Sequence, residues 1–169
     1  QDVIKSRIDG HYENYFEVDG KGNIMSPGFV DLHAHFRDPG FTYKEDLKSG
    51  SNAAINGGFT TVVLMPNTQP AIDNPDILGN QLDRSNNLPI RLLHTGCLTQ
   101  QRKGEALLDF KDFKSMIEKG CVGFSDDGDH LKDSIMIEHA LRFFSGRVPL
   151  MDHAEDHLFL DEGVMNDRN

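Results

Sequence analysis

The stretch FVDLHAHF, residues 29–36, joins a short apolar run to two histidines that stand two positions apart. An apolar run of this length favours a buried β-strand. Because residues two apart in a strand project from the same face, His33 and His35 are expected to point together. Neutral imidazole nitrogen is a good ligand for zinc, so the stretch predicts a strand that ends in metal ligands.

Four more apolar stretches follow at nearly constant spacing, and each indicates a short buried strand. They are TTVVLM (60–65), IRLLHT (90–95), CVGFS (121–125) and VPLMD (148–152). A spacing of about 30 residues between strands suits βαβ units, in which parallel strands alternate with crossover helices. Strands buried on both faces are expected in such a sheet.

Helical segments are predicted between these strands. The first, 44–56, follows a Thr-x-x-Glu capping signal at Thr42 and Glu45 and ends at Gly57-Gly58. The other three cover 73–86, 106–119 and 133–144. The alternation of strands and helices predicts an α/β fold with a parallel sheet.

The favoured fold class is a partial TIM-type (β/α)8 barrel, with about five of its eight β/α units in residues 27–169. Because a complete barrel needs about 250 residues, we expect further strands beyond Asn169. A doubly wound open sheet is the structural alternative. Residues 1–26 contain turn sequences such as Asp19-Gly20 and predict the remnant of a small flanking β domain.

The composition is that of a globular protein, with 37% hydrophobic and 26% charged residues and a net charge of −10. This charge, with no basic patch, argues against nucleic-acid and membrane-surface partners. Cys97 and Cys121 are too few for a disulfide framework and are predicted to pack near strands. Together these features favour a cytoplasmic protein.

Polar side chains follow the ends of the other predicted strands. Asn67 comes after the second strand, Asp126 and Asp127 come after the fourth, and His153 ends the fifth. Taken alone, the aspartates would indicate a solvated turn and His153 a core histidine. Because active sites of β/α barrels assemble at the carboxyl ends of the strands, the agreement between several strand ends favours a functional site.

Arg37 and His94 allow two interpretations each. Arg37 lies two residues beyond His35, on the same face, where its guanidinium could hold a carboxylate through two parallel hydrogen bonds. A surface ion pair is the equally supported alternative for Arg37. His94, near the end of the third strand, is predicted to pack in the core, with a supporting role behind the metal ligands as the alternative.

Five motifs together resemble the dihydroorotase family of the amidohydrolase superfamily. They are PGFVDLHAHFRDPG (27–40), MPNTQP (65–70), FSDDG (124–128), MDHAED (151–156) and GVMN (163–166). The resemblance implies a metal-containing β/α barrel with a small β-sandwich, of the type that uses an aspartate in place of a carboxylated lysine. Hydantoinases and allantoinases share the His-x-His strand but typically lack the pairing of HFRDPG with MPNT.

The same resemblance implies zinc-dependent, reversible hydrolysis of dihydroorotate to N-carbamoyl-aspartate in pyrimidine biosynthesis. It implies one or two zinc ions, held by His33, His35, Asp127 and His153. Asp126 is the alternative to Asp127 as the aspartate ligand. Arg37 and Asn67, together with His35, would bind the substrate, and the two former residues would hold its carboxylate.

In the family, the general acid–base is an aspartate at the end of the eighth strand. We expect that residue beyond Asn169, so no catalytic acid–base is predicted in this chain, and residues 1–169 alone are expected to be inactive. Aspartate transcarbamoylase and further copies of the chain are the partners that the resemblance suggests. The alternatives are another cyclic amidase, such as a hydantoinase or allantoinase, and a non-catalytic dihydroorotase-like scaffold subunit.

Overall fold

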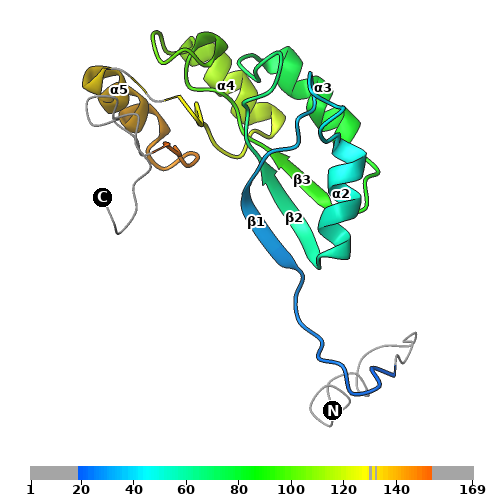
Figure 1. Cartoon of the computed structure of the whole chain (residues 1–169). Helices are drawn as coiled ribbons and strands as arrows, with labels where there is room; N and C mark the ends of the chain where they lie inside the picture. Colours follow the sequence, from blue (N-terminus) through cyan, green and yellow to red (C-terminus); the bar gives the residue numbers. More distant parts are fainter. Residues whose placement is uncertain (1–18, 130, 132, 154–169) are drawn as a thin grey trace, which may run out of the picture.

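A computed structural model describes residues 19–129, 131 and 133–153, in which strands and helices alternate (Figure 1). The elements are β1 (Phe29–Ala34), α2 (Leu47–Asn56), β2 (Phe59–Leu64), α3 (Pro75–Ser85), β3 (Arg91–His94), the 3-10 turn η1 (Gln100–Arg102), α4 (Phe110–Lys119) and α5 (Ser134–Phe144). The predicted α/β class is therefore confirmed. The GVMN motif and residues 1–18 of the predicted β domain lie outside the described residues.

The three strands form a parallel sheet in sequence order, with β2 between β1 and β3. Pairing then continues beyond β3 through single parallel bridges, from Gly96 to Phe124 and from Phe124 to Leu150. The order of pairing is that of the five predicted strands, but the fourth and fifth are each reduced to a single bridging residue, Phe124 and Leu150. Gly123 and Pro149 lie beside these bridges, and both residue types are poor strand formers.

The start of α2 differs from the prediction. The side chain of Asp46 accepts a hydrogen bond from the Ser49 backbone N–H at 2.7 Å, and the Ser49 hydroxyl lies 3.1 Å from the Asp46 backbone nitrogen. This capping box replaces the predicted one at Thr42 and Glu45, because residues 41–44 form a turn instead of helix. The end of α2 at Gly57 is as predicted.

Two apolar clusters hold the described chain together. One fills the space between the sheet and α2 and contains Leu47, Val62, Leu64, Ile90 and Leu92. The other packs α3, α4 and α5 around an aromatic group in which Phe113, Phe124 and Phe144 have ring centroids 4.8–5.0 Å apart. Cys97 and Cys121 are both buried and unpaired, as predicted.

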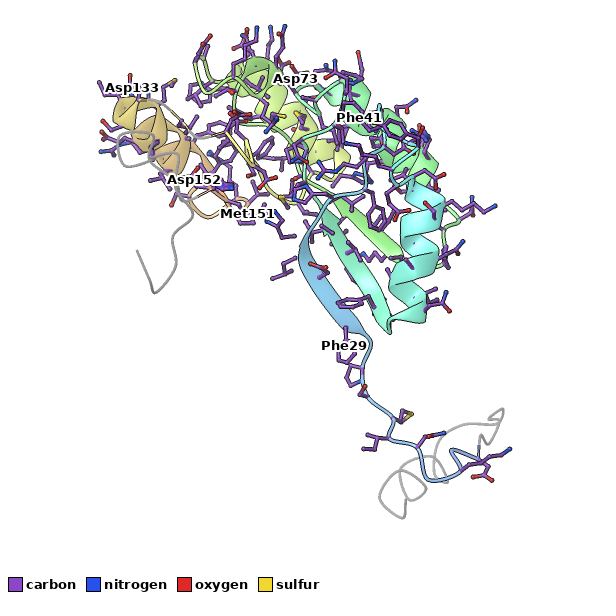
Figure 2. All side chains as sticks on the ribbon, in the orientation of Figure 1. Phe29, Phe41, Asp73, Asp133, Met151 and Asp152 are labelled. Atoms are coloured by element: carbon purple, nitrogen blue, oxygen red, sulfur yellow. The ribbon has the colours of Figure 1, made fainter. Side chains whose placement is uncertain are left out.

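Strand β1 departs from the expectation of burial on both faces. Phe29, Val30 and Leu32 are more than half-exposed, and Figure 2 shows Phe29 near the free end of the strand. The reason is position, because β1 is the edge strand of the described sheet and pairs only with β2. Ahead of it, residues 20–23 form the predicted turn, but residues 19–28 contain no strand.

None of the helices in the described part of the chain is both long enough and apolar enough to cross a membrane.

Candidate metal centre

His33 and His35 meet at the carboxyl end of β1. His33 is in the strand and His35 follows its last residue, and their Nε2 atoms lie 3.2 Å apart. The predicted sharing of one face is therefore confirmed. The His33 side chain is 52% exposed and that of His35 is 28% exposed, so the pair opens towards solvent on the His33 side.

Asp127 brings a carboxylate to the same point from a distant part of the sequence. Its Oδ1 lies 3.2 Å from His33 Nε2, and its Oδ2 lies 3.4 Å from His35 Nε2. Each of the three residues offers one ligand atom, and these atoms all lie within 4.8 Å of one another. Asp127 follows the bridge at Phe124, so the three residues gather at the carboxyl edge of the sheet.

Asn67 connects two of these residues. Its Nδ2 donates to Asp127 Oδ2 at 2.9 Å, and its Oδ1 lies 2.9 Å from His35 Nδ1. Since an ionised carboxylate only accepts, the amide oxygen must face His35, whose Nδ1 then carries the proton. This tautomer leaves the lone pair of His35 Nε2 free towards His33 and Asp127.

The donor set fits a divalent metal such as zinc. Two nitrogen ligands about 2.0–2.1 Å from a tetrahedral zinc ion are separated by about 3.3 Å. Here the two Nε2 atoms lie 3.2 Å apart, and each is 3.2 or 3.4 Å from the nearer of the two Asp127 carboxylate oxygens. Two imidazoles and one carboxylate are also among the combinations that zinc accepts. The residues present could therefore hold a metal with little movement.

The neighbouring carboxylate of Asp126 points elsewhere. It accepts hydrogen bonds from the backbone N–H groups of Leu98 and Thr99 at 2.7 and 3.1 Å, and a third from the Thr99 hydroxyl. Burial raises the pKa of this carboxyl, while the bonds from Thr99 and Leu98 act in the opposite direction. Of the two aspartates, Asp127 therefore lies beside the histidines, whereas the Asp126 side chain is bound by the backbone of Leu98 and Thr99.

The remaining predicted site residues are not in this cluster. Arg37 is half-buried, and its guanidinium makes no hydrogen bond or ion pair with residues 19–129, 131 and 133–153. His153 is exposed and does not belong to the group of ligand atoms found among the described residues. The ligand role of His153 and the substrate role of Arg37 remain predictions.

His94 packs in the core, as predicted. Ser85 donates its only hydroxyl proton to Gln81 O at 2.8 Å, so His94 Nε2, 2.7 Å away, donates to the Ser85 oxygen. His94 Nδ1 is then a buried acceptor without a partner among the described residues. Burial lowers the pKa of His94 to about 4, so the ring is neutral near pH 7.

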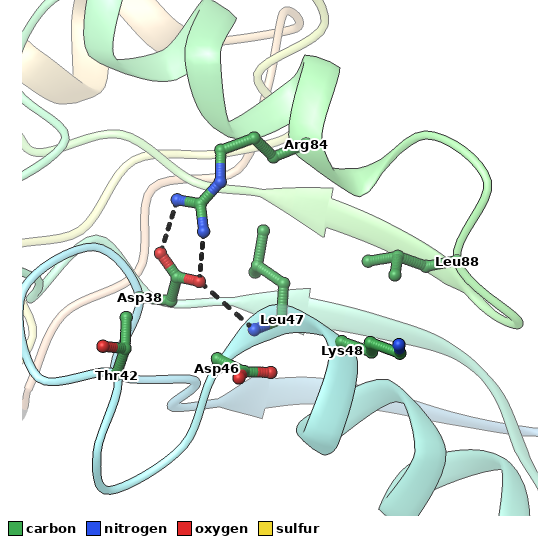
Figure 3. A pocket seen from close by; sticks show the side chains of 7 residues that line it. All are labelled: Asp38, Thr42, Asp46, Leu47, Lys48, Arg84 and Leu88. Carbon is green, nitrogen blue, oxygen red and sulfur yellow. Dashed lines mark hydrogen bonds and ion pairs between the residues drawn. The ribbon is translucent and has the colours of Figure 1, made fainter.

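Sequence reasoning missed an ion pair near His94 in which a buried carboxylate meets a partly exposed arginine. The Asp38 carboxylate, 1% exposed, accepts two parallel hydrogen bonds from Arg84 at 2.5 and 2.6 Å (Figure 3). The Leu47 backbone N–H adds a longer bond of 3.4 Å. The pair ties the segment after β1 to α3, and its members are 46 positions apart, which gives no local signal in the sequence.

Comparison with known proteins gives a consistent family assignment. A family model described as Dihydro-orotase-like matches residues 22–169. The chain is 49% identical over 152 residues to a dihydroorotase of Aquifex aeolicus, covering 89% of this chain and 35% of the relative. It is 42% identical over 168 residues to a dihydroorotase of Clostridium acetobutylicum, covering 98% and 39%. The chain thus spans less than half the length of these relatives.

Solved structures support the fold. A dihydroorotase of Saccharomyces cerevisiae in complex with 5-fluoroorotic acid matches with a TM-score of 0.63 at 15% identity, over 84% of this chain and 40% of that chain. An L-hydantoinase of Arthrobacter aurescens matches with a TM-score of 0.62 at 21% identity, over 78% and 30%. With the family model matching residues 22–169, this chain belongs to the Dihydro-orotase-like family.

Proposed function

We propose that this chain carries part of the active site of a dihydroorotase, which reversibly hydrolyses the cyclic amide of dihydroorotate to N-carbamoyl-aspartate. The observation that carries the proposal is the convergence of His33, His35 and Asp127 in a member of the Dihydro-orotase-like family. Relatives named dihydroorotase that are up to 49% identical support the choice of reaction. The proposed whole-protein fold is a β/α barrel of which the described sheet is one part.

In this proposal His33, His35 and Asp127 hold a zinc ion, and His153 contributes to a second ion that shares Asp127. When bound, zinc supplies a Lewis acid that makes water a better nucleophile near neutral pH and polarises a carbonyl oxygen. The protein itself fixes the donors: the Asn67 amide orients the His35 ring and the Asp127 carboxylate. Such supporting hydrogen bonds tune the affinity of a metal site.

Arg37 and Asn67, together with His35, are the proposed substrate-binding residues. The Arg37 guanidinium has its donors uncommitted among the described residues, and a planar carboxylate matches it through two parallel bonds. Asn67 uses one N–H on Asp127, so its second N–H stays available to a ligand. Holding the carboxylate of dihydroorotate in this way would fix the amide relative to the metal donors.

The proposed reaction and the proposed assembly each involve groups outside the described site. A general acid–base must move protons to the ring nitrogen, and no described residue is assigned that role. Assembly with aspartate transcarbamoylase or with further copies of the chain is part of the same proposal and follows from the family resemblance alone, whereas the proposed cytoplasmic location rests on the composition and the two cysteines.

The direct experiment is an assay of the complete natural polypeptide with dihydroorotate, hydantoin and allantoin, before and after removal of metal by a chelator. We expect zinc-dependent turnover of dihydroorotate only. The variant Arg37→Met should raise KM for dihydroorotate at least about tenfold, since a charge-assisted bidentate contact is lost. Arg142→Met is the matched control, because Arg142 pairs with Glu138 on the exposed side of α5.

A hydantoinase is the second candidate, favoured by the structural match to the L-hydantoinase. It would be supported by equal turnover of substrates that lack a carboxylate and by an unchanged KM in Arg37→Met. A non-catalytic scaffold is the third candidate, and zinc binding without turnover of any of the three substrates would support it.

A further inference from the structure

Arg102, which belongs to no motif identified in the sequence, contacts the loop that carries Asp127. Its Nη1 donates to the backbone carbonyls of Asp126, at 3.1 Å, and of Asp127. The same nitrogen pairs with Asp129 Oδ2 at 2.8 Å. The Arg102 side chain is 26% exposed, so these bonds are partly shielded from water. One side chain therefore contacts three residues of the Asp126–Asp129 turn.

The contact is reciprocal. While Arg102 reaches from residues 98–104 to the Asp126–Asp129 turn, the Asp126 side chain reaches back to the backbone of Leu98 and Thr99. The Thr99 hydroxyl also accepts from the Gly104 N–H at 2.9 Å, which closes the segment that carries Arg102. The two segments are thus joined in both directions, although they lie more than 20 positions apart in the sequence.

The direction of Asp127 follows from this arrangement. Asp126 and Asp127 are the first two residues of the turn, and their side chains have different partners. With the Asp126 side chain bound to the backbone of Leu98 and Thr99, that of Asp127 faces the histidines. Gly128, at φ 80°, then turns the chain, and the Asp129 N–H closes the turn on Asp126 O at 3.2 Å. A Cβ atom at Gly128 would lie 3.4 Å from Arg102 Nη1, so the guanidinium packs directly on the turn.

The backbone at Arg102 is strained. Gln101 and Arg102 have φ values of 53° and 59°, in the left-handed region that side-chain-bearing residues seldom adopt. Such a conformation costs free energy and persists where surrounding contacts hold it, often beside a functional site. The strained pair places the Arg102 side chain against the turn that contains Asp127.

We propose that Arg102 is a positioning residue of the metal centre, which acts through the backbone carbonyls of Asp126 and Asp127 to direct the Asp127 carboxylate towards His33 and His35. The inference rests on the metal centre put forward under the proposed function. It assigns Arg102 no contact with metal or substrate. Its consequence is that loss of the guanidinium weakens metal binding although all the proposed ligands remain.

The test measures zinc affinity of the complete natural polypeptide by competition with a chromophoric chelator, at a temperature where the metal-free protein is folded. Arg102→Met is expected to lower the affinity about 10- to 100-fold, the range found when groups that orient metal ligands are removed. Arg102→Lys should recover part of the loss, because an ammonium group can still meet the carbonyls but lacks the planar fork. Arg142→Met, on the exposed side of α5, should bind zinc as the unchanged protein does.

A melting curve of the metal-free proteins separates positioning from general stability. A purely structural Arg102 would lower the melting temperature of Arg102→Met but leave the zinc affinity of the folded protein within about twofold, and that result would overturn the inference. An affinity above that of the unchanged protein would also overturn it, because the positive charge would then merely oppose the metal. If Arg102→Met does not fold, Arg102→Lys decides: a loss of threefold or more supports positioning, and a smaller loss rejects it.

The outcome distinguishes this inference from the proposed function. An unchanged protein that binds no zinc contradicts the metal centre and, with it, any positioning role for Arg102. An unchanged protein that binds zinc, with Arg102→Met and Arg102→Lys binding equally well, rejects the role of Arg102 alone.

Discussion

Two polar clusters lie within the same sheet-and-helix framework, and they differ in how their members are satisfied. In the cluster of Asp38 and Arg84, every carboxylate oxygen meets an N–H donor, so the charges complement one another. In the cluster of His33, His35 and Asp127, two imidazole nitrogens and a carboxylate converge on one point. The first cluster is complete by itself, whereas the second gathers acceptors that a cation would complete.

This difference separates structural from functional polar residues more clearly than burial does. The Asp127 side chain is only 9% exposed and that of Asp38 1%, yet their partners differ in kind. A buried acid bound by an arginine fork stabilises the fold only while both partners are present. A buried acid that faces two imidazoles is suited to hold a metal. Substitutions in the two clusters should therefore affect different properties.

The largest effect is expected for Asp127→Asn, which keeps the shape of the side chain but removes its charge. A structural zinc site contributes about 10–16 kcal/mol in total, so one of a few ligands accounts for several kcal/mol. We expect zinc affinity to fall by about 100- to 1000-fold, with little change in urea unfolding of the metal-free protein. Asp126→Asn, measured in parallel, should affect unfolding more than Asp127→Asn does. A loss of affinity below tenfold for Asp127→Asn would contradict the comparison.

Arg84→Met should show the opposite behaviour. Removing one partner of a fully buried ion pair costs about 3–5 kcal/mol. Because the Arg84 side chain is 45% exposed, solvent screening reduces the expected loss of unfolding free energy to about 2 kcal/mol. Zinc affinity should not change. The double variant Asp38→Leu with Arg84→Leu should regain part of the stability that Arg84→Met loses. A loss of zinc affinity in Arg84→Met without a loss of stability would contradict the comparison.

His94, near the pair of Asp38 and Arg84, makes the unfolding free energy depend on pH. Its pKa is about 4 in the folded protein and near 6.5 when unfolded, so its contribution is complete above pH 6.5 and is lost as the pH falls towards 4. Between pH 7.5 and 5 the metal-free protein should lose about 2 kcal/mol through this group. His94→Leu should remove that share of the pH dependence. His139→Gln is the control, because His139 is exposed on α5 and should leave the dependence intact.

The smallest expected effect concerns the amide that supports the metal donors. Asn67→Ala should lower zinc affinity about tenfold without substrate present, since His35 and Asp127 each lose an orienting hydrogen bond. Asn56→Ala, which removes an amide bonded within α2, is the matched control. Equal zinc affinity of Asn67→Ala and the unchanged protein would restrict Asn67 to its proposed substrate role.

Much of the candidate site could be predicted because it follows from two repeating geometries. The two-residue period of a strand places His33 and His35 on one face, and parallel strands end at the same edge of their sheet. These rules also bring Asn67 and the Asp126-Asp127 pair to that edge. The choice between the two aspartates was harder to derive from spacing, because it depends on the Leu98 and Thr99 amides that bind Asp126.

The features that were missed depend on contacts between distant residues. The pairing of Asp38 with Arg84 and the reach of Arg102 to Asp126 each join positions more than 20 apart. An isolated arginine in a sequence is by default a solvated side chain, so neither arginine gave a signal. The fourth and fifth strands are shortened for a local reason, because Gly123 and Pro149 disfavour strand structure. The pattern of apolar residues, on which the prediction is based, does not include this effect.

The most direct test of the metal centre is a crystal structure of the complete natural polypeptide with zinc, measured with anomalous scattering at the zinc edge. Our account predicts a peak within about 2.3 Å of His33 Nε2, His35 Nε2 and an Asp127 carboxylate oxygen. A crystal grown in zinc with no peak at these atoms, or with zinc bound to Asp126 in place of Asp127, would contradict it.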